Sequence, residues 1–263
     1  MQPDDISDLL QDGDSDDPAE ILVPTGGHRN QEVPQGAFRI RLADGDQGRR
    51  EADQLVGRMY ERRGYDTAFL TATRAGEPFT LVAFDAGHAL GTLTLKLDSA
   101  SGLSVDELYR DEIDGVRGPQ RRLCELVRLA VERGRDSKRV LASLFHTAYI
   151  YGRLLNRVTD VFIEVNPRHV AFYQRMLGFH VAGPERLNTR VDAPGVLLRL
   201  ELDYVDRQIA ELGGQGDSAA GLRSLYPYFF SAKEAQGIAE RLRRAAEESH
   251  GASPSAAPVA PIA

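Results

Sequence analysis

Residues 121–179 constrain the fold most, because their pattern changes from strand to helix twice. Residues 121–131 contain enough apolar and β-branched side chains for a buried strand. Residues 137–157 repeat apolar side chains at intervals of three and four, the period of a helix with one buried stripe. Residues 159–165 form a second apolar strand. Two strands joined by a crossover helix are expected to be parallel, with a right-handed connection.

A short helix over residues 168–177 is predicted by the residues at both of its ends. Asn166 can cap the first turn, and Pro167 fits the first helical position because its missing N–H would have no partner there. Gly178 follows the last apolar residue and can adopt the left-handed conformation that ends many helices.

The rest of the chain supplies further strands and helices around this unit. The predicted strands are residues 37–42, 80–84, 89–97 and 196–202, with a partner strand beginning at 180–183. The predicted helices are residues 47–63, 104–114, 204–212 and 231–247, and capping-box patterns open the second and the last. These elements predict an α/β fold with a mixed central sheet flanked by helices, in one domain over residues 37–247.

The charge of the chain belongs mainly to its N-terminal segment. Residues 1–36 hold nine acids against one arginine, a net charge of −8, so the remainder carries +1 of the total of −7. This segment and the Ala, Pro and Ser of residues 248–263 are predicted to be disordered. A nearly neutral folded part argues against nucleic-acid binding, which requires a strongly basic domain.

Composition excludes several other classes of protein. No apolar run approaches the ~20 residues that span a bilayer, and the acidic start is unlike a secretory signal or transit peptide. Cys124 is the single cysteine, so there is no internal disulfide framework or cysteine cluster for zinc, and in an apolar strand we expect it to be inert core. We predict a cytoplasmic protein without a metal site or a permanently bound cofactor.

Two charges interrupt the apolar strand at residues 121–131. Glu125 and Arg128 lie in its middle, where a charge is costly unless it is paired or opens onto a cavity. One interpretation is a structural ion pair, and the other is a functional site. Because residues three apart on a strand point to opposite faces, either shared role requires a local bulge.

The order of elements and one motif carry a resemblance to a known family. Residues 166–179 read Asn-x4-Ala-Phe-Tyr-x4-Gly-Phe, and further matching segments are residues 108–114, 122–128, 137–146, 162–169 and 224–230. Together they resemble the GNAT (acyl-CoA N-acyltransferase) fold, and more closely the FeeM-type long-chain N-acyl amino acid synthases, which are related to LuxI-type autoinducer synthases. The resemblance covers about residues 37–247.

The resemblance implies three catalytic residues. Both families carry Glu-x-x-Arg on the central strand, so Glu125 is the candidate base or amine-positioning group, and Arg128 orients it or binds the acceptor carboxylate. Tyr173 occupies the position of a tyrosine that protonates the leaving thiolate in many GNAT enzymes. The alternative for Tyr173 is core packing, which is what we expect of Phe172.

A basic loop at the start of the helix beginning at Ser137 is the candidate donor site. GNAT enzymes carry a glycine-rich loop here for the coenzyme A pyrophosphate, whereas this loop has only Gly134. That favours a phosphopantetheine arm on acyl carrier protein, whose acidic surface would attract the loop. The alternative for the loop is a solvated charged segment without a ligand. The alternative for Asn166 is that it only caps its helix. The candidate donor-binding residues are Arg133, Arg135, Ser137, Lys138, Arg139 and Asn166.

The resemblance therefore implies transfer of a long acyl chain from acyl carrier protein to the amino group of an amino acid. The alternatives within acyl transfer are an acetyl-CoA-dependent N-acetyltransferase and an acyl-homoserine lactone synthase. A third alternative is a non-catalytic module that binds acyl carrier protein. Residues 99–120 either help to wall the substrate pockets or cover an edge of the sheet.

Overall fold

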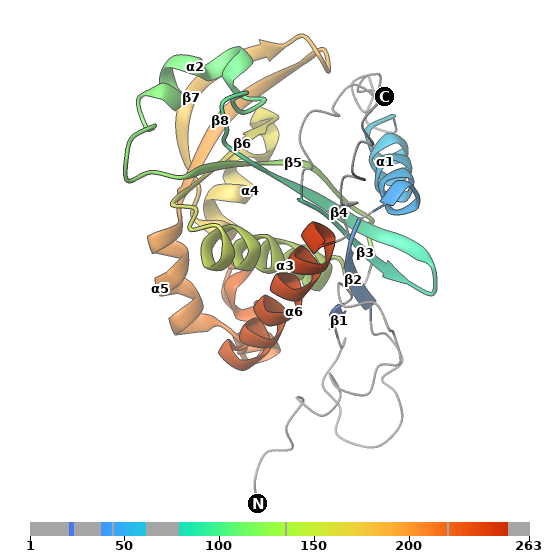
Figure 1. Cartoon of the computed structure of the whole chain (residues 1–263). Coiled ribbons are helices and arrows are strands. Elements are labelled where there is room, and N and C mark those ends of the chain that lie inside the picture. Colours follow the sequence, from blue (N-terminus) through green and yellow to red (C-terminus); the bar gives the residue numbers. More distant parts are fainter. Residues whose placement is uncertain are drawn as a thin grey trace, which may run out of the picture.

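The computed structural model describes residues 21–23, 38–43, 45–61, 79–134, 136–219 and 221–251 (Figure 1). Across these ranges one mixed sheet has eight strands in the order β1-β2-β3-β4-β5-β6-β8-β7. The strands are β1 (Ile21–Val23), β2 (Phe38–Leu42), β3 (Phe79–Asp85), β4 (His88–Leu97), β5 (Leu123–Val131), β6 (Asp160–Val165), β7 (His180–Asn188) and β8 (Ala193–Glu201). The α-helices are α1 (Gly45–Glu61), α2 (Asp106–Asp114), α3 (Ser137–Tyr149), α4 (Pro167–Leu177), α5 (Leu202–Leu212) and α6 (Ala232–Gly251).

The helices cover both faces of the sheet, as the sequence predicts for an α/β fold (Figure 1). Leu123 on β5 and Phe162 on β6 pack in a small core with α2, while Val82 on β3 packs on the same face with α1. Their strand neighbours Cys124 and Ile163 point the opposite way, into the main core with α3 to α6. Glu125 continues the alternation of Leu123 and therefore lies on the face that α1 and α2 cover.

The strands β5 and β6 are parallel, as predicted, but they pair over only three residues. The register ends where Glu125 lies opposite Phe162, so the two strands part beyond this point. The other pairs in the sheet are antiparallel. The parting opens the centre of the sheet beside Glu125.

A β-bulge interrupts β5 three residues after Glu125. Thr92 pairs with Ala130 and Thr94 with Val127, so two residues of β5 lie opposite one residue of β4. Arg128 is one of the two, and its φ of +55° is left-handed, which is uncommon for a residue other than glycine. The bulge that the spacing of Glu125 and Arg128 required is therefore present.

Three local predictions are corrected by the structure. Ile21–Val23 forms β1, although no strand was expected in residues 1–36, because this short apolar run pairs along β2. The helix from Ser137 changes to a π-helix at Ile150–Leu155 and does not continue as an α-helix. Ser104 does not cap α2: the helix begins after Val105, without a side-chain cap.

The ends of α4 agree with the sequence. The Asn166 side chain accepts a hydrogen bond from the Arg168 N–H, Pro167 is in the first turn, and Gly178 is left-handed with φ of +82°. Within the described ranges, no helix combines the length and apolar character needed to cross a membrane.

Gly178→Ala is expected to lower the free energy of unfolding by about 1–3 kcal/mol. An added Cβ would lie 2.3 Å from the Tyr204 ring, and the left-handed backbone disfavours any side chain. Gly237→Ala is the control, because its Cβ meets nothing within 4 Å in the middle of α6 and should stabilise by about 0.5–1 kcal/mol. Chemical denaturation of both variants measures their free energies of unfolding. Equal changes in the two variants would contradict a special requirement for glycine at position 178.

Candidate active site

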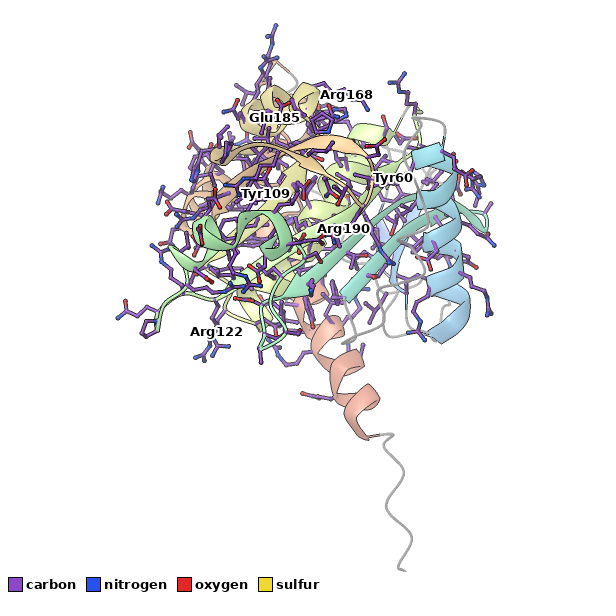
Figure 2. The ribbon with its side chains drawn as sticks, turned by 90° about the horizontal axis from the view of Figure 1, so that it is seen from above. Tyr60, Tyr109, Arg122, Arg168, Glu185 and Arg190 are labelled. Atoms are coloured by element: carbon purple, nitrogen blue, oxygen red, sulfur yellow. The ribbon has the colours of Figure 1, made fainter. Side chains whose placement is uncertain are left out.

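A cavity of about 440 Å³ lies where β5 and β6 part. Its lining comes from both sides of the sheet: Tyr60, Leu93, Ser104, residues 125–131, Leu141, Phe145, residues 163–166, His169, Phe172, Tyr173, Asn188, Arg190, Val191 and residues 193–195. Figure 2 shows Tyr60 and Arg190 in the space between α1 and α2. The cavity therefore passes through the opened sheet, from the face of α1 and α2 to that of α3 and α4.

Glu125 is the buried acid of this cavity, only 2% exposed. The backbone N–H of Ser104 donates to its Oε2 at 2.7 Å. Burial raises the pKa of Glu125 to about 7, against the opposing effects of the Ser104 N–H and the charge of Lys96. A carboxyl group with a pKa near neutrality can accept and release a proton at physiological pH, as a general base must.

The segment that supplies the Ser104 N–H is fixed by a cluster of charges. Asp106 accepts from the Leu103 N–H at 2.8 Å and from Arg117 at 2.7 Å. Arg117 also donates to Asp98 and to Asp114. Because Ser104 lies between Leu103 and Asp106, Arg117 acts as a positioning residue for the donor to Glu125.

Arg128 also lines the cavity, from the bulge in β5. Its guanidinium donates to Asp53 of α1 at 3.0 Å. Asp53 lies outside the cavity lining, so this ion pair holds the Arg128 side chain from the α1 side of the cavity. The structure thus brings Glu125 and Arg128 to one cavity.

The aromatic pair on α4 faces the same cavity. Tyr173 packs edge to face with Phe145, Phe172 and Phe179. The expectation that Phe172 is core is wrong, because α4 turns this side chain to the cavity, where it is 39% exposed. Tyr173 therefore lies across the opened sheet from Glu125, on a helix fixed by Asn166, which also lines the cavity.

The basic loop before α3 is separate from the cavity. Lys138 lies over the Tyr228 ring at 4.0 Å, and Arg139 pairs with Asp217 at 2.6 Å. Ser137 donates to the Gly134 carbonyl within the turn that carries Arg133. None of these residues contributes to the cavity lining, and Arg135 lies outside the described residues. The described residues of this loop are therefore not part of the cavity.

Several cavity residues were not predicted from the sequence: Tyr60, Glu164, His169, Asn188 and Arg190. Glu164 had a detectable signal, because it is a charge within an apolar strand, as Glu125 is. Asn188 and Arg190 have no periodic pattern, and their position follows only from the β7–β8 hairpin.

Two further residues lie outside the cavity lining. Cys124 is buried core, as expected, and burial raises the pKa of its thiol. His146 is buried and only half satisfied: its Nδ1 accepts from the Phe230 N–H at 2.8 Å, but its Nε2 has no partner among the described residues. Burial lowers the pKa of His146 to about 3, so the ring is neutral. Within the described ranges, no cluster of His, Cys, Asp and Glu could hold a metal ion.

Comparison with known proteins decides the family. A sequence model described as "N-acyl amino acid synthase FeeM" matches residues 51–201, which is more than half of the chain. The chain belongs to the FeeM N-acyl amino acid synthase family. Its resemblance to this family and to the GNAT fold is confirmed, and the protein is an N-acyltransferase. No curated protein matches the chain.

Three solved structures are similar to this chain. FeeM, an N-acyl amino acid synthase from uncultured soil microbes, is 28% identical with a TM-score of 0.57, over 63% of this chain and 90% of that one. The acyl-homoserine lactone synthase LasI is 16% identical with a TM-score of 0.45, over 63% and 90%. An acyl-CoA N-acyltransferase from Pseudomonas aeruginosa is 18% identical with a TM-score of 0.43, over 62% and 97%.

Proposed function

We propose that this FeeM-family enzyme transfers a long-chain fatty acyl group from acyl carrier protein to the amino group of an amino acid. The observation that carries the proposal is Glu125, a buried carboxyl group with a pKa near 7 at the opening between β5 and β6. The family supports the N-acyl amino acid product.

In the proposed reaction, Glu125 accepts a proton from the ammonium group of the acceptor. The free amine attacks the thioester carbonyl, so a C–N bond forms and the C–S bond then breaks. Tyr173 donates its phenolic proton to the departing thiolate, and the second proton that the attacking nitrogen loses restores the phenol, so the products are an amide and a free thiol. Backbone N–H groups of β5, exposed where β6 departs, are candidates for stabilising the oxyanion.

The acyl chain has an apolar continuation in the fold. A smaller cavity of about 30 Å³ shares Leu126 and Phe145 with the large one and extends between α3 and α5. Its lining is almost entirely apolar. This cavity has room for only about two water molecules, so a hydrocarbon chain can follow this direction only if the lining side chains move apart. We assign this direction to the hydrocarbon chain, with the thioester between Glu125 and Tyr173.

The second part of the proposal is that acyl carrier protein is the donor. Lys138 and Arg139 begin α3, beside the exposed turn of Arg133 and Ser137. Basic side chains at a helix N-terminus attract both a phosphate and an acidic protein surface. Arg128, in the cavity, is proposed to bind the acceptor carboxylate or to orient Glu125, and Asn166 to border the pantetheine arm.

Lys138→Glu combined with Arg139→Glu is expected to raise the KM for acyl carrier protein at least about tenfold, because reversed charges repel an acidic partner. The KM for the amino acid should stay unchanged. Arg243→Glu with Arg244→Glu is the matched control, since it reverses two exposed charges on α6. Steady-state kinetics at two salt concentrations measures the effect, and equal effects from both variants would contradict carrier docking at this loop.

Tyr173→Phe is expected to lower kcat on the order of 10- to 100-fold, because the leaving thiolate loses its proton donor. The ring keeps its aromatic contacts, so the thermal unfolding temperature should change little. Tyr204→Phe removes the same hydroxyl group outside the cavity lining and should leave kcat unchanged. A Tyr173→Phe variant with full activity would assign the tyrosine to packing alone.

Reconstitution tests the proposed function directly. Purified protein is incubated with a mixture of amino acids and either palmitoyl acyl carrier protein or palmitoyl-CoA or acetyl-CoA, and the products are identified by mass spectrometry. We expect N-palmitoyl amino acids with the carrier protein as the better donor. Acetylated products would favour the acetyltransferase alternative. A lactone, formed in a parallel reaction that supplies a homoserine derivative with a leaving group on its γ-carbon, would favour the autoinducer synthase. Carrier binding without any product would favour the non-catalytic module.

A further inference from the structure

Glu164 is a second carboxylate in the cavity, and the proposed acyl transfer gives it no role. It lies on β6 two residues beyond Phe162, which pairs with Glu125. Residues two apart on a strand share a face, so Glu164 and Glu125 are on the same side of the sheet, toward α1 and α2. The two carboxylates therefore border the acceptor side of the cavity together.

The carboxylate of Glu164 is held in a fixed position. Asn188 Nδ2 donates to its Oε1 at 2.8 Å. Gly195 on β8 provides the space, because a Cβ at that position would lie 2.1 Å from the same oxygen. The Gly195 carbonyl accepts from the hydroxyl group of the buried Tyr109 at 2.8 Å, which fixes the strand behind the carboxylate.

One oxygen of Glu164 is left for a ligand. Among the residues that the structure describes, no group donates to Oε2, and this atom is not one of the buried atoms without a partner. Because Glu164 lines the cavity, Oε2 is accessible from it. Burial raises the pKa of Glu164, against the Asn188 hydrogen bond and the charge of Arg190. An arriving cation would compensate the cost of burying this charge.

The arginines of the cavity lining have carboxylate partners outside it. Arg128 pairs with Asp53 at 3.0 Å, and Arg190 pairs with Glu107 at 3.2 Å. Asp53 and Glu107 are absent from the cavity lining. The acids within the lining are Glu125 and Glu164. In the proposed reaction the acceptor's ammonium group contacts Glu125, which leaves Glu164 without a positively charged ligand.

We propose that Glu164 binds a positively charged side chain of the acceptor, so that the acceptor is a basic amino acid. This inference rests on the proposed acyl transfer to an amino acid. The α-amino group is then at Glu125 and the side-chain cation at Glu164, so each carboxylate of the lining faces one positive group.

Arginine and citrulline are the test acceptors. They have nearly the same shape and hydrogen-bonding N–H groups, but only arginine carries a side-chain charge, and its guanidinium stays protonated, so acylation is confined to the α-amino group. With palmitoyl acyl carrier protein as donor, kcat/KM for arginine should exceed that for citrulline at least about tenfold, because a hydrogen bond to a charged group contributes more than a neutral one.

Three variants separate recognition from folding. Glu164→Gln should reduce the preference for arginine over citrulline to about twofold or less. Gly195→Ala should reduce it as well, because its Cβ displaces the carboxylate without removing the charge. Glu185→Gln removes an exposed carboxylate of β7 that is outside the lining and should leave the preference unchanged. A preference ratio is independent of the fraction of folded protein.

Two results would overturn the inference: equal use of arginine and citrulline by the wild-type enzyme, or a preference for arginine that survives Glu164→Gln. In both cases acyl transfer to an amino acid would still occur, so the proposed function would stand. The absence of acylation with every amino acid would instead refute the proposed function.

Discussion

Glu125→Gln is expected to lower kcat by about 10²- to 10⁴-fold, the range that a positioned general base contributes. In the wild-type enzyme, kcat/KM should rise with pH through about 7, because the carboxylate must be ionised to accept the proton and its pKa is raised to about 7. Glu164→Gln, assayed with citrulline as acceptor, is the matched comparison, since it makes the same change in the second carboxylate. In this variant kcat/KM should still rise with pH near 7. If kcat/KM of Glu125→Gln also rose near pH 7, as in the wild type, the role of Glu125 would be contradicted.

The stability of Glu125→Gln separates a catalytic role from a structural one. A carboxyl group whose pKa is raised by folding stabilises the protein most below its unfolded pKa, and this contribution is lost as the pH rises through about 7. At pH 8 the wild-type protein therefore bears a buried charge that the glutamine amide lacks. We expect the variant to unfold at a higher temperature than the wild type at pH 8, with a smaller difference at pH 5. A lower unfolding temperature at pH 8 would mean that Glu125 mainly anchors α2.

Arg117→Met is expected to lower the free energy of unfolding by about 3 kcal/mol, because it leaves carboxylates without their common cation. Asp106 is the most affected, since it is only 4% exposed. The loss should also release the Ser104 N–H from Glu125, so kcat/KM should fall roughly tenfold and its rise should move to higher pH.

Arg122→Met is the control for Arg117→Met. Arg122 is exposed and lies at the periphery of the molecule, away from α1 (Figure 2). The Arg122→Met variant should change neither the free energy of unfolding nor the pH profile of kcat/KM. Denaturation and pH-dependent kinetics on both variants measure the effects. A loss of stability in Arg117→Met without a shift of the pH profile of kcat/KM would mean that Arg117 stabilises the fold but does not position the Ser104 N–H.

Two identical sequence patterns show what local sequence can predict. Ser231-x-x-Glu234 forms a capping box at α6, where Glu234 accepts from the Ser231 N–H at 2.7 Å. Ser104-x-x-Glu107 does not, because the Ser104 N–H donates to Glu125 on β5. The tertiary contact replaces the local one, and no pattern around Ser104 indicates it.

The central strand β5 also shows which features can be predicted from local sequence and which depend on tertiary contacts. The sequence located Glu125 and Arg128 and showed that a bulge was needed for both to serve one site. It did not show that Arg128 pairs with Asp53, because that contact depends on how α1 packs. Asn188 reaches Glu164 through the pairing of β7 with β8 and of β8 with β6, a register that only the assembled sheet defines.

The most direct test of the account is mass spectrometry of lipid extracts from cells that produce the wild-type protein or Glu125→Gln. We predict new N-acyl amino acids with the wild-type protein, absent from the variant, and their masses identify the acceptor and the chain length together. Equal amounts of these lipids with both proteins would contradict the central role of Glu125. No new lipid with either protein, in cells where acyl carrier protein still co-purifies with the wild type, would contradict catalysis.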